Sequence, residues 1–249
     1  MKRYLVVGLL VFVGAVVAFI PAGVVDRALD QTPYIDMVEA RGTVWRGSGQ
    51  LLALDGTPIG AATWVFEPAS LLGLLPRYRW RLDQALAQLD GTAATRGDVL
   101  HLTAAGDVAA ALLNDWLRIY DITLTGDFTL RVDALSWVLA EAQLSSATGE
   151  LTWTGGTVTY VMGGQIRQAQ LPPMLAVLET QARDGATPAN VQITAYAVGD
   201  ETPLMIASQS DDGYVKIGIT KGFTKLLRNP WPGSDPDHTI VLEVEERLL

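Results

Sequence analysis

The chain has 249 residues, of which 49% are apolar and only 18% are charged. This balance argues against intrinsic disorder, and the length is sufficient to bury a substantial core. The formal net charge of −9 would repel a phosphate backbone, so we expect no nucleic-acid partner. Cysteine is absent, which excludes disulfides, thiolate zinc sites and cysteine nucleophiles.

The first feature along the chain is an uncharged run of 22 residues, 4–25. As a helix rising about 1.5 Å per residue it would extend about 33 Å, which matches a hydrocarbon core of roughly 30 Å. A cleaved signal peptide is the alternative, but its apolar region is usually about 7 to 15 residues long, and Ile20 lies where a small residue is wanted. We therefore predict an uncleaved membrane anchor. Its representative residues are Tyr4, Leu10, Phe12, Phe19 and Val25.

The charges beside this run predict its orientation. Lys2 and Arg3 precede it, whereas only Arg27 follows closely. Positive charge stays on the cytosolic side, so the amino terminus is expected in the cytosol and the rest of the chain outside. In a bacterium with two membranes this predicts a cytosolic stub and inner-membrane anchor at residues 1–25. Residues 26–249 then form one periplasmic β-rich domain.

The sequence GTVWRGSGQL after the anchor contains a tryptophan, an arginine and three glycines. We predict that residues 43–45 form the first strand and that Gly47 and Gly49 allow a bend or bulge before pairing resumes. The alternative is that Arg46, lifted by this bend, meets a carboxylate of a partner. Glycine inside a strand usually solves a backbone problem, so the first interpretation is favoured.

Further strands follow from alternation of apolar and polar residues. A strand is predicted at residues 124–133, where three apolar residues alternate with three polar ones and so indicate one buried face. The apolar residues are Phe128, Leu130 and Val132, and the polar ones are Thr129, Arg131 and Asp133. A turn at Gly163-Gly164 would continue the chain as a meander. The other predicted strands are residues 165–170, 191–198, 204–208, 214–220 and 238–245.

The sequence LTWTGGTVTY predicts a hairpin around Gly155-Gly156, because two glycines can supply the positive φ angles of a two-residue turn. The resulting register places Leu151, Trp153, Val158 and Tyr160 on one face and four threonines on the other. The sequence thus predicts that this part of the sheet has one apolar face.

Few helices are predicted, and all are short. Glu67-Pro68 opens one that Pro76 closes, and Asp107 is expected to cap another. Pro172-Pro173 would begin a third that ends at Gly185. Two weaker candidates are residues 133–139 and 220–227. The predicted fold class is mainly β (β-rich α+β), a transmembrane helix followed by a curved antiparallel sheet with a few short helices.

Groups suited to catalysis are scarce. The two histidines, His101 and His238, lie far apart in sequence, and no serine lies in a nucleophile-elbow motif. A spatial triad with Ser48 stays open. Residues 235–238 could bind a cation weakly, although the surrounding prolines and glycine indicate an exposed loop. Nucleotide-binding motifs are absent, so we predict no enzyme, no cofactor, no metal and no small-molecule substrate.

The tryptophans are interpreted mainly as core residues. Trp45, Trp64, Trp80 and Trp153 fall in strand-like runs, where an aromatic residue on a sheet face usually packs inside. A lipid-binding groove would need the same residues. Trp231 could lie at a rim or partner surface.

The anchor, GTVWRGSGQL and the run ATWVFEPASLLGLLPRYRW at residues 62–80 together resemble protein N of the bacterial type II secretion system. The resemblance implies an inner-membrane protein with a β-rich periplasmic domain and no catalytic residues. It also implies contacts with inner-membrane platform subunits and the secretin that assist assembly or stability of the machine. The residues carrying it are Gly42, Thr43, Val44, Trp45, Gly47, Trp64, Pro68, Leu71 and Leu72.

A second resemblance gives the alternative function. The layout is similar to AsmA-like periplasmic proteins, whose curved sheets are thought to carry lipids between membranes. That alternative predicts a continuous apolar groove along one sheet face.

Overall fold

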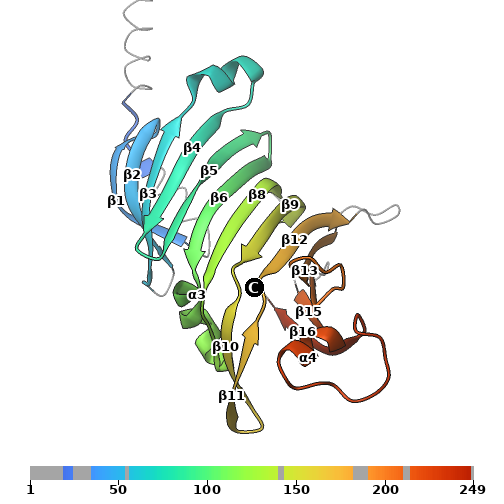
Figure 1. The fold of residues 1–249 in the computed structure, drawn as a ribbon. Coiled ribbons are helices and arrows are strands. Elements are labelled where there is room, and N and C mark those ends of the chain that lie inside the picture. Colours follow the sequence, from blue (N-terminus) through green and yellow to red (C-terminus); the bar gives the residue numbers. More distant parts are fainter. Residues whose placement is uncertain are drawn as a thin grey trace, which may run out of the picture. The chain divides into compact units, whose positions relative to one another are not determined.

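The structure is a computed structural model, and it describes residues 19–24, 35–53, 56–139, 143–181, 190–209 and 214–247. The chain is mainly β, with antiparallel strand pairing and a few short helices, as the sequence predicted (Figure 1). It divides into two compact units, residues 1–94 and 95–249.

The described residues contain no helix that has both the length and the apolar character needed to cross a bilayer. Only residues 19–24 of the predicted anchor belong to this part of the chain. Phe19 is therefore described, whereas Tyr4, Leu10, Phe12 and Val25 lie outside the described residues.

The first unit is an antiparallel meander in the order β1-β2-β3-β4-β5. A 3-10 helix, η1, connects β3 to β4. The short helix predicted to begin at Glu67-Pro68 is thereby confirmed. The elements are β1 (Ile35–Thr43), β2 (Arg46–Ala53), β3 (Pro58–Phe66), η1 (Pro68–Gly73), β4 (Arg77–Gln84) and β5 (Ala87–Arg96).

The prediction for the start of this sheet was wrong in the bounds of the first strand. β1 ends at Thr43, and residues 44 and 45 form the turn into β2 rather than a strand. Gly47 and Gly49 lie in regular register in β2, opposite Trp64 and Ala62 of β3. A Cβ at Gly47 would overlap the Trp64 indole, and one at Gly49 would overlap the Met37 side chain. The register of β1 against β2 shifts between Val38 and Arg41, next to Gly49, so an irregularity is present there and its extra residue lies in β1.

The second unit has a larger antiparallel sheet in the order β6-β8-β9-β12-β13-β14-β15-β16 and a three-stranded sheet in the order β11-β10-β7. Its helices are α3 (Ala110–Leu117), η2 (Arg118–Tyr120) and α4 (Lys221–Leu226). The larger sheet contains β6 (Val99–Ala109), β8 (Asp127–Val138), β9 (Gln143–Trp153), β12 (Met174–Gln181), β13 (Asn190–Ala197), β14 (Met205–Gln209), β15 (Tyr214–Thr220) and β16 (Ile240–Arg247). The smaller sheet contains β7 (Ile122–Leu124), β10 (Gly156–Met162) and β11 (Gln165–Leu171).

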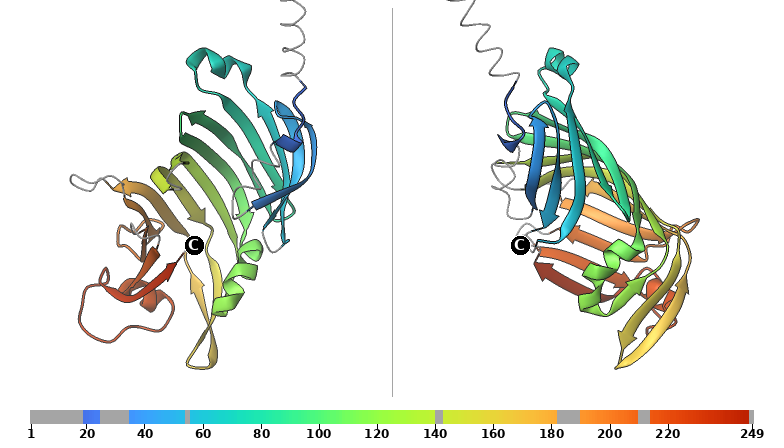
Figure 2. Two further views of the ribbon diagram at one scale, coloured as in Figure 1. Left: turned by 180° about the vertical axis from the view of Figure 1, so that it is seen from behind. Right: turned by 90° about the vertical axis from the view of Figure 1, so that its left-hand side faces the viewer.

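The predicted hairpin at Gly155-Gly156 does not form. β9 pairs with β8 and β12, whereas β10 pairs with β7 and β11, so the two glycines mark a corner between two sheets. Gly155 has a φ of 79°, and a Cβ there would lie 2.7 Å from the Pro173 nitrogen. The chain turns out of the larger sheet here because only glycine fits this close approach. Figure 2 shows the β10–β11 hairpin beside α3.

Two of the predicted helices are strands. Residues 133–139 belong mostly to β8, and the run after Pro172-Pro173 forms β12 between β9 and β13. Most of β12 is partly buried, and only Glu179 among its described side chains is exposed, so period-2 alternation is weak. Asp107 does not cap α3, because it lies within β6 and its carboxylate accepts a 2.8 Å hydrogen bond from Thr129.

Other local predictions were confirmed. The Gly163-Gly164 turn joins β10 to β11, with both φ angles positive. A helix forms at α4, where the Thr220 side chain accepts a hydrogen bond from the Phe223 amide. The alternating residues 128–133 give β8 its half-buried face, although this strand begins at Asp127 and Leu124 belongs to β7.

Candidate functional site

One end of the first unit's sheet holds most of the residues that carried the family resemblance. The Val44 amide donates to the Ile20 carbonyl at 3.0 Å, and the Ala22 amide donates to the Gly42 carbonyl at 3.1 Å. These bonds attach residues 20–22 to the β1–β2 turn. We call the region formed by residues 20–22, 42–47 and 64–76 the motif end.

Trp64 anchors the inner side of the motif end. Its side chain is buried, packs with Ala22 and Met37, and donates from Nε1 to the Thr43 carbonyl at 3.2 Å. A Cβ at Gly47 would overlap the Trp64 indole. Gly47 therefore leaves the space in which this tryptophan lies.

Aromatic contacts connect the turn to the two following strands. The ring of Trp45 lies 5.0 Å from that of Phe66, which in turn lies 5.1 Å from that of Tyr78. The Phe66 amide also donates to the Trp45 carbonyl at 2.6 Å. Burial raises the pKa of the Tyr78 hydroxyl. These contacts fix the β1–β2 turn against β3 and β4.

η1 forms a braced loop at the same end. Ser70 Oγ donates to the Glu67 carbonyl at 2.5 Å and accepts from the Arg77 amide at 3.0 Å. Arg79 forms an ion pair with the Glu67 carboxylate at 2.5 Å. Leu74 adopts a φ of 53°, which ends the helix in a left-handed residue.

This brace holds three leucines in solvent. Leu71, Leu72 and Leu74 are 51%, 92% and 86% exposed, respectively. We call Leu71, Leu72 and Leu74 the leucine loop. Sequence reasoning identified Leu71 and Leu72 as structural motif residues, but it did not predict that they would point away from the core.

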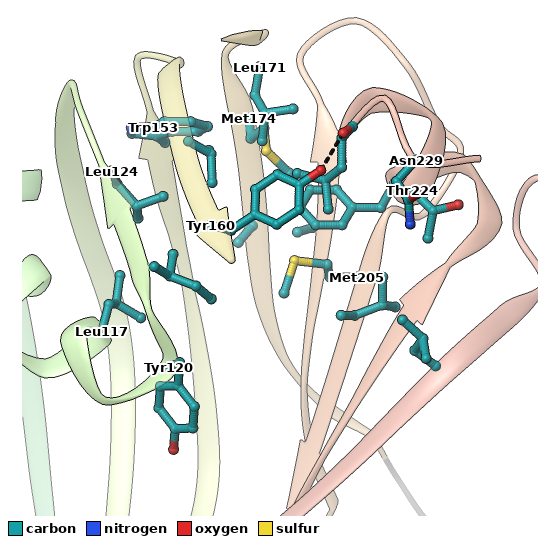
Figure 3. Close-up of a pocket in the computed structure, with 18 of the residues that line it drawn as sticks. Leu117, Tyr120, Leu124, Trp153, Tyr160, Leu171, Met174, Met205, Thr224 and Asn229 are labelled. Carbon is teal, nitrogen blue, oxygen red and sulfur yellow. Dashed lines mark hydrogen bonds between the residues drawn. The ribbon is translucent and has the colours of Figure 1, made fainter. Parts of the chain in front are cut away.

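A large apolar cavity lies within the second unit. Its volume is about 680 Å³, within the range of about 300–1,000 Å³ typical of ligand pockets (Figure 3). Residues 117–242 supply the lining, and none of the lining side chains is charged. The alternative, lipid-carrying function predicted an apolar face of this kind, and here it takes the form of a partly enclosed chamber.

The floor of the cavity is a continuous row of cross-strand partners on one sheet face. Six adjacent strands each contribute one residue, and each residue pairs with the next across the sheet. The order is Leu151, Ala176, Ala195, Met205, Ile219 and Leu242, which we call the apolar row. The two alanines near its middle leave space that larger side chains would fill.

The roof comes from the smaller sheet and from α4 with the segment that follows it. Val158 and Tyr160 of β10 and Phe223 of α4 line this side. The Tyr160 hydroxyl donates to the Leu227 carbonyl at 2.6 Å, which joins the two parts of the roof (Figure 3). Trp153 and Val158, which were predicted on one face of a hairpin, instead line the same cavity from different sheets.

Several polar groups in the lining have partners within the protein. Trp153 Nε1 donates to the Thr125 carbonyl at 3.0 Å, and Thr224 Oγ1 donates to the Lys221 carbonyl at 2.8 Å. Asn229 Nδ2 lies 3.0 Å from Met162 Sδ. These polar groups are therefore engaged within the protein, and the surface they leave for a ligand is almost wholly hydrocarbon.

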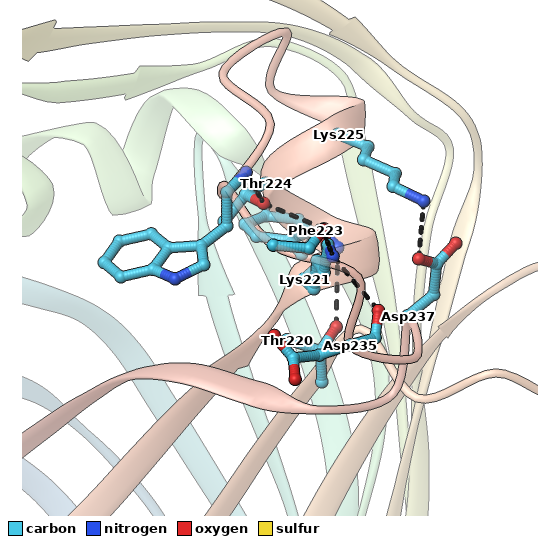
Figure 4. A network of polar contacts seen from close by, with 9 residues as sticks. Thr220, Lys221, Phe223, Thr224, Lys225, Asp235 and Asp237 are labelled. Atoms are coloured by element: carbon cyan, nitrogen blue, oxygen red, sulfur yellow. Dashed lines mark hydrogen bonds and ion pairs between the residues drawn. The ribbon is translucent and has the colours of Figure 1, made fainter.

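A buried lysine holds the roof segment in place. Lys221 is 5% exposed, and its Nζ donates to the carbonyls of Gly233 and Asp235 at 2.5 and 3.0 Å (Figure 4). Lys225, on the same helix, pairs with the Asp237 carboxylate at 2.5 Å near the surface. The connection between α4 and β16 thus wraps around α4 instead of extending freely.

The candidate catalytic and metal-binding residues do not assemble into a site in the described residues. His101 Nδ1 lies 3.1 Å from Ser136 Oγ, but the two residues are register partners on β6 and β8 and neither lines the cavity. The described part of the chain contains no group of three side chains suited to hold a metal. Asp235 and Asp237 instead contact the lysines of α4.

A comparison with known families identifies the chain. Residues 33–200 match the family described as type II secretion system protein N, which is more than half of the chain. The chain belongs to the type II secretion system protein N family. This confirms the resemblance stated from the sequence. No curated protein and no solved structure matches the chain.

The family match covers the motif end after residue 33 and most strands of the larger sheet. As a protein N family member, the chain is a type II secretion component. The last part of the cavity, from Met205 to Leu242, follows the matched region. The sequence predicted an apolar groove only as part of the alternative function and did not locate this cavity, because the apolar row comes from six separate strands.

Proposed function

We propose that this protein N family member is anchored in the inner membrane with its main body in the periplasm. There it assists assembly or stability of the type II secretion machine by contacting other subunits through its leucine loop. Family membership supports a secretion role. The observation that carries the proposed contact is the exposure of Leu71, Leu72 and Leu74 at the end where residues 20–22 join the sheet.

The position of the loop gives this proposal its physical basis. Residues 20–22, which follow most of the predicted anchor, bond to Gly42 and Val44. The motif end is therefore bonded directly to the last residues of the predicted membrane segment. A membrane tether raises the effective concentration of this end near other anchored subunits, so modest contacts suffice.

The chemistry of the loop favours an apolar partner surface. Burying one leucine side chain contributes about 1.5–3 kcal/mol, and η1 holds the leucines with little ordering left to be done on binding. The expected partners are inner-membrane platform subunits, with the secretin as a further candidate. Nucleic acid and small-molecule substrates are not expected.

Exchanging the leucine-loop residues tests the proposal. Leu72→Ser with Leu74→Ser in the full chain should reduce recovery of other secretion subunits in pull-downs from native membranes by roughly tenfold or more. Secretion of an exported protein should fall in parallel.

The matched control is Leu86→Ser. Leu86 is also exposed but lies in the β4–β5 turn, at the other end of the same sheet. Its exchange should leave recovery unchanged. Equal recovery with the double variant and the wild-type chain, at equal protein level, would contradict the proposed contact.

A further inference from the structure

We infer that the cavity of the second unit binds the hydrocarbon chain of a membrane lipid or fatty acid. The first support is its chemistry. About 680 Å³ of space is lined without any charged side chain, and the polar groups at Trp153, Tyr160 and Thr224 are bonded within the protein. Water molecules would find few hydrogen-bond partners in this lining. An apolar ligand, by contrast, gains favourable free energy for each methylene that it buries.

The lining also discriminates between classes of guest. A sugar or nucleotide needs polar partners, and a peptide segment carries amide and carbonyl groups that cost free energy when buried unpaired. The bonded polar groups of the lining have little left to offer such a ligand. A hydrocarbon chain has no polar group that needs a hydrogen-bond partner. Its burial against this lining therefore carries the smallest desolvation penalty.

The dimensions of the apolar row match one chain. It crosses six neighbouring strands from Leu151 to Leu242, so at about 4.8 Å per strand it extends about 24 Å. One leaflet of a bilayer has a hydrocarbon depth of about 15 Å. The row therefore has the length for an acyl chain, and Ala176 and Ala195 supply width near its middle.

The rim suits an amphiphilic guest. Tyr120, Met162, Trp231 and Leu242 line the cavity yet remain 37–48% exposed. Aromatic side chains with one polar atom are favoured where an apolar region meets water. Flexible methionines at positions 162, 174 and 205 let the walls adapt to chains of different shape.

Photoaffinity labelling of the purified full-length chain in amphipol tests this inference. One arm uses a free fatty acid that carries a diazirine on its chain, and the other uses a phospholipid with the same labelled chain. After irradiation, peptides are mapped by mass spectrometry. Labels are expected in segments around Met162, Met174 and Met205, and an excess of unlabelled oleate should compete with the fatty-acid probe. The arm that labels more strongly identifies the source of the chain.

Filling the row provides the decisive variant. Ala195→Phe places a ring in the centre of the cavity and should reduce labelling of these segments roughly tenfold, the loss expected when about two methylenes can no longer be buried. Ala134→Phe, at an exposed position of β8 outside the lining, should label like the wild type. Ala176→Met serves as a milder filling variant if Ala195→Phe fails to fold.

Three outcomes would overturn the inference. They are no labelling of the cavity segments by either probe, labelling confined to residues 1–25, and cavity labelling that a folded filling variant leaves unchanged. The first two would also be expected if the cavity held a protein segment instead of a lipid chain.

Discussion

At the scale of single residues, the motif end depends on side chains that are missing as much as on those present. Gly47 lies under the indole of Trp64, and that indole bonds to the Thr43 carbonyl. Gly42 adopts a φ of 93° with its Cβ position 2.5 Å from the Arg46 carbonyl oxygen. Gly47 of this motif thus leaves the space that the Trp64 side chain fills. The motif serves packing, which explains why it was recognisable in the sequence although it contains no catalytic residues.

Gly47→Ala should destabilise the first unit. The new methyl group would displace the Trp64 indole and weaken its hydrogen bond, at a cost of about 1–3 kcal/mol. Urea unfolding followed by tryptophan fluorescence measures the loss. Gly73→Ala is the control, because a Cβ there meets nothing within 4 Å, and we expect a change within about 0.5 kcal/mol. Equal stability of the two variants would show that Gly47 is not needed for this packing.

At the scale of elements, local signals predicted well and long-range pairing did not. The Gly163-Gly164 turn and the helix within residues 220–227 depend on neighbouring residues, and both were predicted. β12 was mistaken for a helix because its strand character comes from its neighbours β9 and β13. The corner at Gly155-Gly156 was mistaken for a hairpin for the same reason, since a two-residue glycine turn and a change of sheet look alike locally.

The roof of the cavity should depend on Lys221. Lys221→Met leaves the carbonyls of Gly233 and Asp235 without their buried donor, which costs about 1–3 kcal/mol. Hydrogen exchange of the α4 amides and the following segment should accelerate. Lys225→Met removes only an exposed ion pair, with an expected cost of about 0–1 kcal/mol. Similar exchange rates in both variants would contradict a specific role for Lys221.

At the scale of the whole molecule, the sequence predicted a mainly β chain and the family, but not where the cavity lies. The apolar row joins residues between Leu151 and Leu242 that share no local pattern, and its volume depends on alanines whose small size matters only after the strands pair. The exposure of the leucine loop was equally hidden, because a leucine-rich run is normally expected inside. Both features appear only when packing is complete.

The most direct test of the proposed contact uses the absence of native cysteine. Leu72→Cys and Leu86→Cys each provide one thiol in the full chain, at opposite ends of the first unit's sheet. After treatment of native membranes with a short thiol-to-amine crosslinker, products are identified by mass spectrometry. The account predicts crosslinks from position 72 to another inner-membrane secretion subunit and few or none from position 86. Equal crosslinking at both positions, or none at position 72, would contradict it.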